Sequence, residues 1–114
     1  MATAIDRAVF AELQATAGDE FVRELVATFL TEAPAMLAEL EDALGADDAD
    51  RFRRTAHSLK SNGNTFGARA FAAMAKELEL GGMAPVRSAG GAPLAALEDE
   101  YKRVAQALTE LKGE

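Results

Sequence analysis

Residues 52–68 read FRRTAHSLKSNGNTFGA. Apolar or small residues follow one another here at steps of 4, 3, 4 and 3, namely Phe52, Ala56, Leu59, Gly63 and Phe66. Because an α-helix has about 3.6 residues per turn, residues at these steps form one stripe along its surface. The spacing predicts a helix from about Asp47 or Asp48 to Asn64 with a single buried face.

Four further segments show helical periodicity, separated by glycines and prolines. They run over about Ile5–Ala17, Asp19–Leu44, Ala68–Leu80 and from Pro93 onward. Thr3 and Asp6 are spaced like a capping box at the start of the first segment. The stretch from Gly81 to Pro93 is rich in Gly and Pro, and we expect it to be a loop between the last two helices.

The second segment has the longest apolar stripe, formed by Val22, Leu25, Val26, Phe29, Ala33, Met36, Leu37, Leu40 and Leu44. Pro34 interrupts it, removes one backbone hydrogen bond and predicts a kink near Leu30 and Thr31. No segment shows the alternation of a β-strand. Amphipathic helices bury their stripes against one another, so the sequence predicts an all-α fold. We expect a single domain over residues 1–114, an antiparallel four-helix bundle with a short additional N-terminal helix.

Composition excludes several classes of function. Hydrophobic residues make up 49% of the 114 residues, enough for a folded domain. The net charge of −7 argues against binding to nucleic acid or to an anionic membrane. The chain has no Cys and one His, so neither a disulfide nor a metal site is expected. No apolar run approaches the roughly 20 residues of a membrane span. Without a signal peptide at Met1–Arg7, we expect a cytoplasmic protein.

The single histidine, His57, lies beside the buried stripe of its helix and shares an exposed face with Lys60 and Asn64, at i+3 and i+7. Arg53 and Arg54 lie one turn earlier, and the small Ser61 one turn later. Cations nearby would favour the neutral, nucleophilic imidazole and offset the charge of an attached anion. An exposed histidine among solvated charges, without any function, is the alternative that spacing alone leaves open.

The run from His57 to Ala68 resembles the motif H-x-L-K-G-x-x-x-x-x-G-A of histidine-containing phosphotransfer (HPt) domains. His57 matches the phospho-accepting histidine, and Lys60 matches the lysine that supports the phosphoryl group. Gly67 and Ala68 match the small pair that opens the next helix. Ser61 replaces the commonest residue, Gly, with another small one.

The resemblance implies a phosphorelay carrier rather than an enzyme. Such a domain takes a phosphoryl group from a receiver-domain phospho-aspartate, or from a kinase, and passes it to a response regulator. It has no ATP site, and no phosphate-binding loop motif occurs here. The implied partners are receiver domains or a hybrid histidine kinase, with no cofactor. We expect a monomer, because a short chain needs the apolar stripe of its last helix for its own core. The start Met1-Ala2-Thr3 favours a stand-alone protein.

A receiver would dock around His57. The candidate contact residues are exposed polar residues of this helix, and its arginines would form a basic patch on an acidic protein. They are Arg53, Arg54, Ser58, Ser61 and Asn64. Residues around Pro34 to Leu37 of the second segment are candidates for an apolar contact, although we expect Met36 and Leu37 to pack in the core. Two other functions compete: an HPt-like docking module that is never phosphorylated, and an enzyme with His57 as general base, for which no companion nucleophile is evident. Clusters of acidic residues are interpreted as helix caps and solvated faces.

Overall fold

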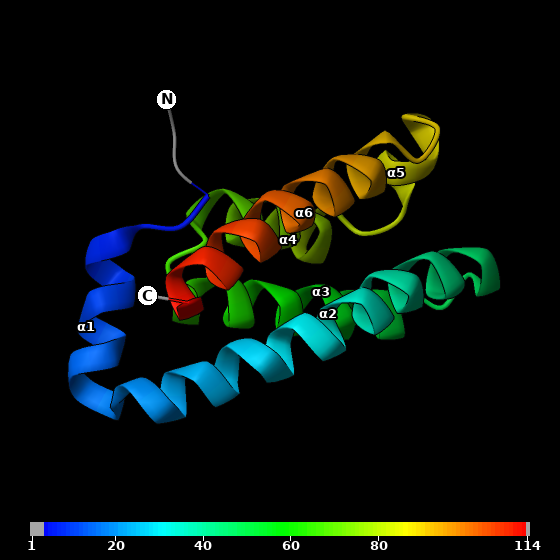
Figure 1. The fold of residues 1–114 in the computed structure, drawn as a ribbon. Coiled ribbons are helices and arrows are strands. Elements are labelled where there is room, and N and C mark those ends of the chain that lie inside the picture. Colours follow the sequence, from blue (N-terminus) through cyan, green and yellow to red (C-terminus); the bar gives the residue numbers. More distant parts are fainter. Residues whose placement is uncertain (1–3, 114) are drawn as a thin grey trace.

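The structure, a computed structural model, describes residues 4–113 and the side chains of residues 4–111. This part of the chain contains helices and no strand (Figure 1), which confirms the predicted all-α class. In chain order the helices are α1 (Arg7–Ala17), α2 (Asp19–Ala46), α3 (Ala49–Phe66), α4 (Arg69–Gly81), α5 (Ala84–Ser88) and α6 (Ala92–Gly113).

Four of these helices form the bundle. Helix α2 packs against α3 and α6, and α4 packs against the same two helices, so that α3 and α6 lie diagonally across the bundle. The α2–α3 and α3–α4 connections are two residues long, which makes neighbouring helices antiparallel. The 28 residues of α2 correspond to about 42 Å of helix. This helix therefore spans the longest dimension of the molecule, 41 Å.

The predicted stripes meet in one core. Phe52, Ala56 and Leu59 of α3 are fully buried. At the centre, the Phe29 ring lies 5.5 Å from Phe66, 6.0 Å from Phe71 and 5.8 Å from Tyr101, measured between ring centroids. These aromatic rings come from α2, α3, α4 and α6, so all four bundle helices are fixed relative to one another through shared contacts.

Pro34 lies inside α2, as its place in the stripe predicts. Its ring has no N–H to donate to the Leu30 carbonyl oxygen one turn earlier. The Tyr101 hydroxyl of α6 donates to that oxygen instead, at 3.4 Å. The backbone group that the proline leaves unpaired thus becomes a link between α2 and α6.

The turn between α3 and α4 is closed by Gly67, whose φ of 80° is left-handed. The Gly67 N–H donates to Asn64 O at 3.2 Å, and the Ala68 N–H donates to Gly63 O at 2.8 Å, the two bonds of a Schellman motif. Helix α3 therefore continues to Phe66, two residues beyond the predicted end.

Helix α1 crosses the end of the bundle at this turn (Figure 1). The Asp6 N–H donates to Gly67 O at 2.8 Å, and Asp6 forms an ion pair with Arg69 at 2.9 Å. Asp6 is also the N-cap, because its Oδ1 accepts from the Ala8 N–H at 3.0 Å. The helix begins at Arg7 and not near Ile5, so the predicted role of Asp6 as third residue of a capping box is wrong. Thr3 lies outside the described residues.

The segment 81–93 is not the loop that its Gly and Pro content predicts, because it contains the one-turn helix α5. Val86 is fully buried, and the Arg87 Nη2 donates to Leu44 O at 2.7 Å and contacts Asp47 Oδ1 at 3.1 Å. Burial of one side chain and a bond to the end of α2 hold this segment. Figure 1 shows α5 at the opposite end of the bundle from α1.

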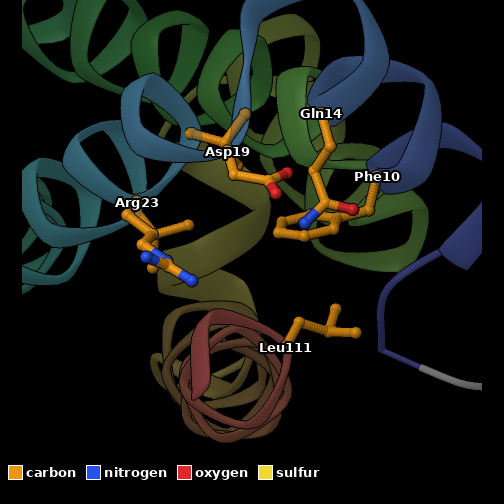
Figure 2. A pocket seen from close by; sticks show the side chains of 7 residues that line it. Phe10, Gln14, Asp19, Arg23 and Leu111 are labelled. Atoms are coloured by element: carbon orange, nitrogen blue, oxygen red, sulfur yellow. The ribbon is translucent and has the colours of Figure 1, made fainter. Parts of the chain in front are cut away.

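A narrow gap lies between α1, α2 and the end of α6 (Figure 2). Phe10 and Leu111 face it from two sides, and Gln14, Asp19 and Arg23 form its polar edge. Its volume of about 30 Å³ is close to the share of liquid volume of one water molecule. Within the described residues, no helix is long and apolar enough to cross a membrane.

Candidate functional site

His57 stands on the exposed face of α3, with 54% of its side chain accessible. The residues on either side of it along the buried stripe, Ala56 and Leu59, are fully buried. The backbone that carries His57 is therefore held by the core, while the imidazole faces outward. A rigid helix position with a free side chain is suited to presenting a nucleophile to another protein.

The imidazole is held by Glu79 of α4, whose Oε2 lies 2.8 Å from His57 Nδ1. The second oxygen of Glu79, Oε1, lies 2.9 Å from Lys60 Nζ. Oε1 is buried and has no well-aligned hydrogen bond, so the Lys60 ammonium compensates it chiefly as a charge. Only 14% of the Glu79 side chain and 23% of the Lys60 side chain are accessible. Lys60 is thus less exposed than its place on the His57 face predicts.

The Glu79 carboxylate is ionised at neutral pH. The close Lys60 ammonium, and after it the hydrogen bond from His57, lowers the pKa of Glu79 below its ordinary value, while burial acts in the opposite direction. An ionised carboxylate can only accept a hydrogen bond, so Nδ1 must be the donor. In the neutral ring we therefore assign the proton to Nδ1. The Nε2 lone pair is then left free.

Helical spacing does not reveal the contact between Glu79 and His57, because it relates only residues of one helix. The signal lies in the register of the α3–α4 hairpin: His57 precedes Gly67 by ten residues, and Glu79 follows Ala68 by eleven. In an antiparallel hairpin with a two-residue turn, residues at nearly equal distances from the turn lie side by side on the two helices.

The two arginines expected around His57, Arg53 and Arg54, pair with an aspartate of the same helix. Arg53 Nη2 lies 2.8 Å from Asp50 Oδ1, and Arg54 Nε lies 3.1 Å from Asp50 Oδ2. Asp50 is in the first turn of α3, so both guanidinium groups are drawn toward the start of the helix. Of the cations predicted to act on the imidazole, the structure brings Lys60 close through Glu79 and places Arg53 in another ion pair.

The remaining candidate contact residues surround His57 on the surface. Ser58, Ser61 and Asn64 are all exposed. Ser58 and Arg54 also border an open hollow of about 240 Å³ between α2 and α3, together with Met36, Glu39, Arg51 and Thr55. Met36 is partly buried and packs against the core, in line with the expected core packing. Among the described residues, no group of three or more His, Asp or Glu is placed to hold a metal ion.

The chain is similar to a known protein family and to a known structure. The Hpt domain family matches residues 24–113. Among solved structures, the chain is similar to histidine-containing phosphotransfer protein B (HptB) from Pseudomonas aeruginosa PAO1, with a TM-score of 0.82 and 30% sequence identity over 99% of this chain and 97% of that one. No curated protein sequence matches the chain significantly. The chain belongs to the Hpt domain family, whose members carry phosphoryl groups on histidine in phosphorelays and are not kinases.

Proposed function

We propose that this protein is a cytoplasmic phosphorelay carrier in which Nε2 of His57 accepts a phosphoryl group from a receiver-domain phospho-aspartate and passes it to another receiver. The observation that supports this most directly is the arrangement of His57, Glu79 and Lys60. Glu79 contacts Nδ1, and the His57 side chain is about half exposed, so Nε2 is the nitrogen that we propose a partner reaches.

In the transfer step, the Nε2 lone pair attacks the phosphorus atom of the aspartyl phosphate. An N–P bond forms, the bond between phosphorus and the aspartate oxygen breaks, and the aspartate leaves as a carboxylate. The Nδ1 proton stays on the ring, which gains positive charge as the new bond forms. The ionised Glu79, 2.8 Å from Nδ1, stabilises that charge and keeps the ring in the reactive orientation.

Lys60 has two partners in this mechanism. In the free protein its ammonium neutralises Glu79 at 2.9 Å. Because 23% of its side chain is accessible and its stem is flexible, the ammonium can also turn toward the phosphoryl oxygens above the ring. Phosphoryl transfer needs positioning and charge stabilisation, and this pair of residues supplies both.

The partner surface that we propose consists of the exposed α3 residues and the hollow beside them. Ser58, Ser61 and Asn64 leave room above the imidazole, and the hollow at Met36 offers an apolar contact. A receiver that carries an aspartyl phosphate is negative at its docking face, which suits the arginines at the start of α3.

Transfer of label tests the proposal. The wild-type chain is incubated with a panel of receiver domains carrying ³²P-phospho-aspartate, and a second set is incubated with a histidine kinase and labelled ATP. We expect acid-labile label on the wild type and none on His57→Gln. Circular dichroism checks that the variant is folded, as expected for an exposed residue.

The competing function is that of an HPt-like module that docks receivers without being phosphorylated. Wild-type protein that binds receivers of the panel but takes up no label from any donor would establish this alternative. Label that persists in His57→Gln would instead place the acceptor at another residue.

A further inference from the structure

All three arginines of α3 are paired with carboxylates of the same chain. Arg51 Nε lies 3.0 Å from Glu39 Oε1, and Arg53 and Arg54 share Asp50. The basic patch that the sequence predicts on this face is therefore neutralised within the free protein. One carboxylate, Asp50, accounts for two of the three arginines.

Asp50 binds the two arginines with different oxygens, Oδ1 to Arg53 at 2.8 Å and Oδ2 to Arg54 at 3.1 Å. Arg53, followed by Arg54, lowers the pKa of the Asp50 carboxyl below its ordinary value, so Asp50 is ionised at neutral pH. All three side chains are more than half exposed. Ion pairs this accessible are weak and exchange readily with another anion.

Asp50 is distant from the chemistry but close to the docking face. It precedes His57 by seven residues, about 10 Å along the helix. Arg54, which Asp50 holds, borders the hollow together with Ser58, the residue next to His57. A change at Asp50 therefore alters the charge that a partner meets without touching the imidazole, Glu79 or Lys60.

We propose that Asp50 restrains docking: in the free protein it occupies the guanidinium groups of Arg53 and Arg54 that an anionic receiver engages in the complex. This inference rests on the proposed function for the identity of the partner. Docking exchanges the internal carboxylate for those of the receiver. The intramolecular pairs thus lower the association rate, and they select for partners whose carboxylates can displace Asp50.

Asp50→Asn tests the restraint, because it removes the negative charge and keeps the size of the side chain. The probe is the unphosphorylated receiver domain of the panel that binds the wild type most tightly, and the association rate is measured by stopped-flow fluorescence. At low ionic strength we expect an increase of about two- to fivefold, which shrinks in 0.5 M salt. Asp99→Asn on α6, diagonally across the bundle from α3, removes the same charge and should leave the rate unchanged.

Loss of a negative charge alone would also attract an anionic partner, so a double-mutant cycle separates the two causes. In an Arg53→Gln/Arg54→Gln background, Asp50→Asn still removes the charge but has no arginine to release. A rate increase in the wild-type background that disappears in this background supports the restraint. The same increase in both backgrounds, or no increase in either, overturns it.

Phosphotransfer is followed separately on the same variants. If the wild type takes up label but Asp50→Asn associates at the wild-type rate, the restraint is wrong and the carrier function stands. If Asp50→Asn binds faster through its arginines but no variant takes up label, the restraint holds for a docking module and the carrier function is wrong.

Discussion

At the scale of single residues, the contact between Glu79 and His57 Nδ1 makes a prediction about transfer. Glu79→Gln keeps a hydrogen-bonding group near the ring but removes the negative charge that, in the proposed mechanism, stabilises the phosphorylated ring. The glutamine amide can donate as well as accept, so it no longer fixes the proton on Nδ1. We expect phosphotransfer to His57 to slow by about tenfold, which corresponds to the loss of one charge-assisted hydrogen bond. Rapid-quench measurement with a saturating phosphorylated receiver checks this.

Glu77→Gln is the matched control, because Glu77 is an exposed glutamate of the same helix two residues away. It should transfer at the wild-type rate. Equal rates for wild type and Glu79→Gln at saturation would show that Glu79 has only a structural role.

Lys60 makes a second prediction at this scale. In Lys60→Ala, the phosphoryl group loses its nearest cation, and Glu79 Oε1 is left buried without compensation. We expect slower transfer or a shorter lifetime of the phosphohistidine, by about tenfold, with the helical content unchanged. Lys60→Arg keeps the charge and should recover part of the loss. A loss of helical content on circular dichroism would contradict the prediction.

At the scale of helices and turns, Gly67 joins three elements. A Cβ at this position would lie 2.8 Å from Val9 Cβ and 3.0 Å from Asp6 O, and the φ of 80° disfavours any side chain. Gly67→Ala therefore both crowds α1 and strains the α3–α4 turn. We expect a loss of about 2 to 4 kcal/mol in the free energy of unfolding, measured by urea denaturation.

Gly45 provides the opposite case. It lies within α2 with ordinary helical backbone, and a Cβ there meets nothing within 4 Å. Gly45→Ala should raise the free energy of unfolding by about 0.5 to 1 kcal/mol, since alanine favours helix. A stable Gly67→Ala protein would show that α1 and the turn can shift to accommodate the methyl group.

The helices themselves could be predicted from the sequence because their stripes are long. Phe52 to Phe66 repeats over four steps, and each step adds to the same helical phase. Helix α5 has five residues, little more than one turn, and no stripe can be recognised over that length. Its helix depends on tertiary contacts, the burial of Val86 and the bond from Arg87 to Leu44 O.

The site was predicted in part for a related reason. His57 and Lys60 lie on one helix, so their shared face follows from the spacing. The carboxylate that joins them, Glu79, belongs to another helix and follows only from the register of the hairpin. For Arg53, helical spacing gives the face but not the partner, which is Asp50.

At the scale of the whole molecule, the net charge of −7 means that carboxylates outnumber cationic side chains, so some carboxylates lie close to one another. Glu98 of α6 illustrates the consequence, because partial burial and then the nearby Glu41 of α2 raise its pKa above the ordinary 4.5. Helices α2 and α6 therefore pack together although two like charges, Glu41 and Glu98, repel each other across their interface.

The sign of the pH effect follows from the raised pKa. The folded state binds the Glu98 proton more tightly than the unfolded chain does, so Glu98 favours folding below pH 4.5 and this contribution is lost as the pH rises through the folded pKa. Glu98→Gln cannot ionise and should be more stable than the wild type at pH 7. That advantage should vanish near pH 4, as urea denaturation at several pH values would show. Glu12→Gln, at an exposed glutamate of α1, controls for net charge. An equal gain in both variants would mean that general repulsion, rather than the Glu41–Glu98 contact, opposes folding.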